Sequence, residues 1–241
     1  KNIGTSLIGV TDVAISPTSG DIWISASAKT SVDINPAAGV VYSSITSFTS
    51  TFLTHTYLAA YTAAAGAYVG NSINTAFGTN SGNTNIQIRA IGFDKNGKIY
   101  ATGDYASNIS GFANQTGTNF GVFTNPSTSG TGGIFTARVD VSTLPTVPTA
   151  QIGVINELSS TVRTIADIAV DGSDNVYITG ASAGHPFTVK YNGSMVKQWE
   201  KEETTITGEG NAISLTGSNV MITGSKSTGL LAAQYTTSSG A

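Results

Sequence analysis

The hydrophobic and polar positions form the same pattern four times along the chain. In each copy a short strand-like segment is followed by a turn containing Gly with Ser, Asn or Asp, and then by an apolar segment. The four copies are residues 12–25, 90–103, 167–180 and 212–224. Turns of this composition tolerate the backbone conformations of tight hairpins. The pattern predicts four β-hairpins and an all-β chain.

The second segment of each copy indicates how the hairpins pack. It is almost continuously apolar, as in residues 22–24 and 176–178. A strand without alternation is typical of a sheet covered on both faces. A β-propeller blade lies between two neighbouring blades and meets this condition. The middle of each first segment is small, as expected for strands that crowd around a central axis: Ala14, Gly92, Ala169 and Ser214.

The spacing of the copies predicts a closed ring. One large residue of the second segment recurs after 77, 77 and 44 residues, at Trp23, Tyr100, Tyr177 and Met221. The remaining step around the chain ends is 43 residues, which matches the shortest repeat. We therefore expect one domain over 1–241, a small propeller of four blades in which residues 1–9 close the ring as the outer strand of the last blade. The alternative is six blades, for which 32–42 is the one plausible trace of a hidden copy.

The two long steps hold insertions of unusual composition. Residues 34–88 and 106–137 contain no Asp, Glu, Lys or Arg. We expect both insertions on one face of adjacent blades. Neutral surfaces that combine aromatic residues with Ser, Gly and Asn suit adaptable recognition. The candidate binding residues are Tyr57, Tyr61, Tyr68, Phe77, Phe112, Phe120 and Phe123. The other interpretation is that these aromatics belong to ordinary outer strands.

Composition excludes several classes of function. Charged residues make up 10% of the chain and the net charge is −3, whereas an ordinary domain has about 25% charged residues. Such a weakly charged surface suits assembly. No basic cluster offers a nucleic-acid site, and no apolar run is long enough for membrane insertion. The chain has no Cys, so no disulfide or Cys-ligated zinc is expected, and no cofactor is predicted.

The titratable residues are interpreted mainly as structural. His55 and His185 have no ligand spacing around them, so no metal site is predicted. Asp94 and Asp171 lie in turns that superficially resemble calcium loops, but too few acids alternate there. We expect both carboxylates to cap their turns. The segment 200–203 is expected to be a solvated outer edge strand, whose charge discourages edge pairing.

One constellation resembles an enzyme site. Asp12 and Asp167 occupy equivalent positions in their copies and could face each other across a central channel, and paired carboxylates are what glycoside hydrolysis uses. No nucleophile elbow or phosphate loop accompanies them, and we expect no catalytic residues. Glycosylation sequons begin at Asn108, Asn114 and Asn192.

The third copy and the residues after it resemble a known repeat. Residues 167–182, with Ile168-Ala-Val-Asp171 and Asn175-Val-Tyr-Ile-Thr-Gly180, continue into 187–199, with Thr188-Val-Lys-Tyr191 and Trp199. This closely resembles the bacterial β-propeller repeat called SBBP, "IAVD..GNVYVTG" followed by "T.KY...G...W". The match is partial over 90–103 and 134–141. The resemblance implies a secreted or cell-surface propeller without catalytic residues.

Together these observations favour a non-catalytic extracellular subunit of a surface assembly, filament or appendage. Its expected partners are other protein subunits, including copies of itself. The alternative is a glycan-binding module that uses exposed aromatic rings. A third hypothesis is an enzyme at the central channel.

Overall fold

The computed structural model describes residues 7–28, 32–33, 42–43, 55–69, 73–77, 86–105, 109–114, 119–124, 133–141 and 163–240. All regular secondary structure in these ranges is β-strand, which confirms the predicted all-β class. The same ranges contain no helix long and apolar enough to cross a membrane.

The strands form four main antiparallel sheets, which we number along the chain. The first sheet has the order β1 (Leu7–Ile15), β2 (Ile22–Ala28), β5 (His55–Tyr61), β6 (Ile73–Phe77), β9 (Ile109–Asn114) and β10 (Asn119–Thr124). The second has β7 (Ile86–Phe93), β8 (Ile99–Tyr105) and β11 (Gly133–Val139). The third has β12 (Arg163–Val170), β13 (Val176–Ser182), β14 (His185–Tyr191) and β15 (Lys197–Glu202). The fourth has β16 (Gly208–Thr216), β17 (Asn219–Lys226) and β18 (Gly229–Thr236).

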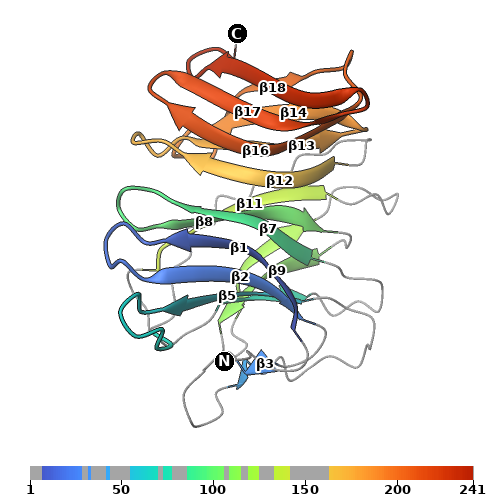
Figure 1. The fold of residues 1–241 in the computed structure, drawn as a ribbon. Helices are drawn as coiled ribbons and strands as arrows, with labels where there is room; N and C mark the ends of the chain where they lie inside the picture. Colours follow the sequence, from blue (N-terminus) through green and yellow to red (C-terminus); the bar gives the residue numbers. More distant parts are fainter. Residues whose placement is uncertain are drawn as a thin grey trace.

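The sheets stack face to face in chain order, with the first and fourth at opposite ends (Figure 1). The innermost strands β1, β7, β12 and β16 lie next to one another in that order. Apolar clusters fill the three interfaces, and each contains buried residues from both sheets: Trp23 and Ile91 in the first, Tyr100 and Ile168 in the second, and Tyr177 and Ile213 in the third. In the middle of the stack Tyr100 and Tyr177 are fully buried. The prediction that the second strand is covered on both faces is therefore confirmed for β8 and β13.

A β-bulge recurs in all four innermost strands. The register shifts at the same repeat position, which holds Thr11, Arg89, Ala166 or Asn211. The bulge pushes a backbone carbonyl against the neighbouring strand, so a Cβ added at Gly180 would lie 2.0 Å from the Thr164 oxygen. Gly103 and Gly224 are confined in the same way. This close approach explains why three copies end in Thr-Gly.

The N-terminal segment does not pair as predicted where it is described. Leu7 and Gly9 lie opposite Ala28 and Ser27, so they extend the innermost strand of the first sheet. We expected residues 1–9 to form the outer strand of the last blade, and for Leu7–Gly9 this expectation is wrong. The cause is the hairpin itself, because β2 is long enough to pair with this segment beyond the bulge.

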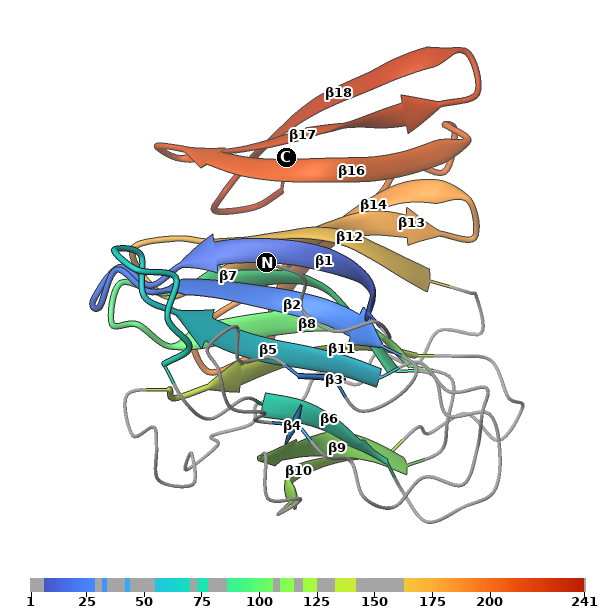
Figure 2. The same ribbon diagram turned by 60° about the horizontal axis from the view of Figure 1, so that its bottom comes forward.

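The two insertions meet in one sheet. β5 and β6 come from the first insertion, and the β9–β10 hairpin comes from the second, between β8 and β11. β6 pairs with β9 over five residues, with Ile73 opposite Asn114 and Phe77 opposite Ser110. Figure 2 shows β6, β9 and β10 together at one side of the molecule. The trace of a hidden copy at 32–42 is described only at its ends, where β3 (Val32–Asp33) pairs with β4 (Tyr42–Ser43).

Candidate functional site

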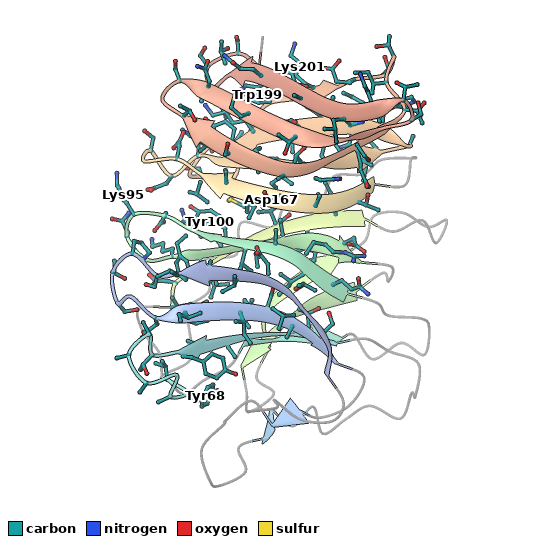
Figure 3. All side chains as sticks on the ribbon, viewed as in Figure 1. Tyr68, Lys95, Tyr100, Asp167, Trp199 and Lys201 are labelled. Atoms are coloured by element: carbon teal, nitrogen blue, oxygen red, sulfur yellow. The ribbon has the colours of Figure 1, made fainter. Side chains whose placement is uncertain are left out.

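Asp167 links the third sheet to the fourth. It lies on β12 in the stack (Figure 3). Its Oδ2 accepts a 2.8 Å hydrogen bond from the backbone N–H of Ile213 on β16, and its Oδ1 accepts one of 2.8 Å from Ile168 N–H. Burial raises the pKa of the Asp167 carboxyl above its usual value; the two hydrogen bonds oppose this rise and the charge of Asp12 adds to it. Both oxygens of this carboxylate therefore accept hydrogen bonds from backbone N–H groups.

Asp12 makes the same link between the first and second sheets. Its Oδ2 accepts a 2.7 Å hydrogen bond from Ile91 N–H on β7, and its Oδ1 accepts one of 2.7 Å from the N–H of Val13. The two carboxylates thus occupy equivalent positions and accept equivalent hydrogen bonds, one near each end of the stack. We call this two-bond arrangement the carboxylate link.

The carboxylate link occurs at alternate interfaces. The second and fourth sheets carry Ala90 and Ala212 at the linking position. No carboxylate is needed between the second and third sheets, because Ile168 N–H is already bonded to its own neighbour, Asp167. The innermost strands therefore alternate Asp, Ala, Asp, Ala along the chain. The sequence pattern identifies the two acids but not the link, for which the signal is an Asp directly before the first Ile or Val of a copy.

The links change the enzyme hypothesis. That hypothesis requires Asp12 and Asp167 to face each other across a channel. Instead, each carboxylate is turned toward the backbone of the next innermost strand. A carboxylate whose two oxygens already accept hydrogen bonds inside the fold is a poor general acid or base, because a substrate would have to compete with these backbone N–H groups for its oxygens.

The hairpin turns are capped as predicted. Asp171 Oδ1 accepts hydrogen bonds from the backbone N–H groups of Ser173 and Asn175, and its Oδ2 accepts one from Tyr177 Oη–H at 3.0 Å. Partial burial would raise the pKa of Asp171, but these bonds and one from the Asn175 side chain outweigh it and lower the pKa below its usual value. Asp94 caps its turn with the same spacing.

The remaining charged groups support the sheets. Glu200 on the outer strand β15 binds Arg163 and, at 2.9 Å, Lys197. Burial would raise the pKa of Glu200, but the two cations lower it. Among the described strands β15 pairs with β14 alone, so the predicted edge position is confirmed for residues 200–202, but residues 200–203 are half-buried and not solvated as predicted. His185 Nδ1 lies 2.7 Å from the Ile206 carbonyl oxygen. Within the described ranges no group of three or more His, Asp or Glu side chains could hold a metal ion.

The predicted aromatic surface is only partly described. Tyr61 is 9% exposed, and its ring centroid lies 6.0 Å from that of the half-buried Tyr68. Figure 3 shows Tyr68 at the end of the stack opposite Trp199. The other candidates lie on strands of the first sheet, but their side chains are outside the described part: Tyr57 on β5, Phe77 on β6, Phe112 on β9, and Phe120 and Phe123 on β10. The structure thus brings the backbones of both insertions together.

The glycosylation candidates differ in their surroundings. Asn192 lies in the turn between β14 and β15, where its Oδ1 accepts hydrogen bonds from the N–H groups of Ser194 and Val196. Asn114 is the last residue of β9. Asn108 lies outside the described residues. Glycosylation at these positions stays a prediction.

The innermost strand of the first sheet exposes apolar side chains. Val10, Val13 and Ile15 on β1 are 53%, 58% and 65% exposed. The residues at the positions of Val10 and Val13 in the second sheet, Ile88 and Ile91, are 0% and 4% exposed. The difference arises because β7 packs against β1, whereas β1 begins the stack. The exposure of β1 is therefore a departure from the repeat pattern within the described residues.

No protein-family model matches the chain, and no curated protein matches it either. The carboxylate links and the exposed apolar strand are therefore the features that bear on function.

Proposed function

We propose that the protein is a non-catalytic interaction subunit of an extracellular assembly, built on four blades of an SBBP-type β-propeller. Its four stacked hairpin sheets and their repeated bulges support the propeller interpretation. The resemblance over 167–199 supports the extracellular location.

One observation carries the non-catalytic assignment. Asp12 and Asp167 are the carboxylates that the enzyme hypothesis needs, and both bind the backbone of the following sheet. Two other acids form ion pairs within a single sheet, Asp104 with Arg89 in the second and Glu200 with Arg163 in the third. Asp12 and Asp167 therefore connect neighbouring sheets, and the two ion pairs each stabilise a single sheet.

The apolar residues of β1 favour protein partners. Val10, Val13 and Ile15 on one strand are all more than half exposed, and apolar side chains exposed close together are typical of an interaction site. The weak overall charge of the chain provides little repulsion between copies.

Light scattering over a wide concentration range tests this proposal. An interaction subunit that binds copies of itself is expected to show a mass that exceeds the monomer or grows with concentration. A mass that stays monomeric at every concentration would count against it.

A glycan-binding module is the second candidate. The observation in its favour is the six-stranded first sheet, which joins strands that carry Tyr57, Phe77 and Phe112. Aromatic rings on one sheet can stack on sugar rings. A glycan array probed with the folded protein separates the two candidates, because selective binding to sugars with a monomeric mass is expected only for the second.

A further inference from the structure

The two ends of the sheet stack have complementary surfaces. We propose that the exposed face of β1 in one molecule packs against the outer face of the fourth sheet in a second copy of this chain. This inference rests on the proposed function as an interaction subunit and names its partner. The contact would continue the stack across the boundary between two molecules.

The three interfaces within the molecule define what such a contact requires. In each, an aliphatic residue of one innermost strand packs on a small residue of the preceding strand. At the second interface a Cβ added at Gly92 would lie 3.5 Å from Ile168 Cγ2. Val13 occupies the position of Ile168, and Ser214 occupies that of Gly92. Val13 and Ser214 are therefore the expected centre of the fourth interface.

The outer face of the fourth sheet carries small and apolar residues like those of the covered faces, but it is exposed to solvent. Ala212 and Ser214 on β16 are exposed, whereas Ala90, at the position of Ala212, is 1% exposed. Met221 takes the place of the fully buried Tyr177 and is only half-buried. Leu230 on β18 is 87% exposed. This face thus offers small and apolar side chains to an incoming strand.

The backbone hydrogen bonds of the two ends also match. At the interface between the second and third sheets, Ala90 provides no acceptor and Ile168 N–H is bonded to Asp167. Ala212 likewise provides none, and Val13 N–H is already bonded to Asp12 Oδ1. In a contact between β16 and β1, the N–H of Val13 would therefore keep its acceptor. The two open ends thus have the same arrangement of backbone donors and acceptors as the interface between the second and third sheets.

The extent of the contact is limited to the inner part of the first sheet. Ala26 and Ala59 lie on the same face as Val13 and are 4% and 1% exposed, so they are already covered. A second copy can reach β1 but not this part of the face. The two end faces lie at opposite ends of one stack (Figure 1). Two chains that cover each other's end faces would form a ring of eight blades, within the size range of known propellers.

Engineered cysteines test this arrangement directly, because the chain has none of its own. We would prepare V13C and S214C as separate proteins, mix them in equal amounts and oxidise them mildly. A disulfide-linked pair of chains is expected in the mixture and not in either variant alone. V196C mixed with S214C is the matched control, since Val196 is 56% exposed but lies in the turn before β15. It is expected to give no linked pair.

Light scattering of V13D and V196D completes the test. V13D is expected to lose the assembly mass of the wild-type protein, while V196D keeps it. Assembly that persists in V13D, together with no V13C–S214C link between chains, would overturn this inference and leave the proposed function standing. A link that forms only within the double variant V13C/S214C would overturn it too, because the stack would then close on itself. A monomeric wild-type protein would overturn both.

Discussion

Removing the Asp167 carboxylate tests whether it holds the third and fourth sheets together. The substitution D167A deletes both acceptors, so the N–H groups of Ile213 and Ile168 lose their partners. These residues are 8% and 7% exposed, so water can replace the lost acceptors only in part. A buried donor left without a partner costs about 1–3 kcal/mol. We expect D167A to lower the free energy of unfolding by about 2–4 kcal/mol. This is near the low end for two donors, because the substitution also removes the cost of burying the carboxylate.

Chemical denaturation of D167A, D12A and E209A provides the measurement. D12A is expected to lose less, about 1–2 kcal/mol, because Val13 is 58% exposed and its N–H can turn to water. Glu209 is an exposed acid on β16 and serves as the control for loss of charge, with a change within about 0.5 kcal/mol. A loss in D167A no larger than that in E209A would refute the reasoning.

The pH dependence gives an independent check on the same residue. The pKa of Asp167 is raised in the folded protein. A raised pKa means that the folded state favours the protonated carboxyl, so the stabilising contribution is complete below the usual Asp pKa and falls as pH rises through the folded value. The stability difference between the wild type and D167N is therefore expected to be largest in acid and to shrink toward neutral pH. A difference that grows with pH would contradict this assignment.

Three further predictions concern the repeat itself. G180A is expected to destabilise the protein by at least about 1–3 kcal/mol, because its Cβ would lie 2.0 Å from a backbone oxygen; G172A, which meets nothing within 4 Å, is the control in the same thermal melts. D171N should lower the free energy of unfolding by about 1–2 kcal/mol at neutral pH. Because the pKa of Asp171 is lowered in the fold, the stability difference from the wild type should shrink as pH falls below the usual Asp pKa. A difference that widens in acid would count against the turn cap. D174G should gain about 0.5 kcal/mol in denaturant titrations, since φ is 63° at this non-glycine residue, and an unchanged midpoint would argue against backbone strain there.

The local parts of the fold were readable from the sequence. Turn composition locates the hairpins and predicts that Asp171 caps its turn, as the structure shows. The unbroken apolarity of residues 176–178 correctly indicated burial on both faces. The same inference fails at the ends of the stack, where Ile24 and Met221 are only half-buried. An apolar strand sequence indicates that the strand can be covered on both faces, but not that a covering sheet is present in the same molecule.

The non-local parts could not be predicted for a physical reason. β6 and β9 belong to separate insertions, and their pairing depends on backbone hydrogen bonds between segments more than thirty residues apart. The neutral polar composition of these segments is compatible with many registers, because it marks no strongly apolar face that would fix one. The carboxylate links were missed for a similar cause. An Asp at the start of a strand has several local roles, and only the neighbouring sheet reveals that Asp167 bonds Ile213.

The alternation of Asp and Ala implies a rule for the number of sheets. Each linking Asp serves two N–H groups, its own neighbour's and the equivalent one in the next sheet, so a sheet with Ala must follow a sheet with Asp. Two successive Ala sheets would leave an innermost N–H without an acceptor, and two successive Asp sheets would place like charges on adjacent strands. The unit of construction is therefore a pair of sheets, joined by Asp12 in one case and Asp167 in the other. A closed ring that follows this rule contains an even number of sheets, a condition that both four and eight sheets meet.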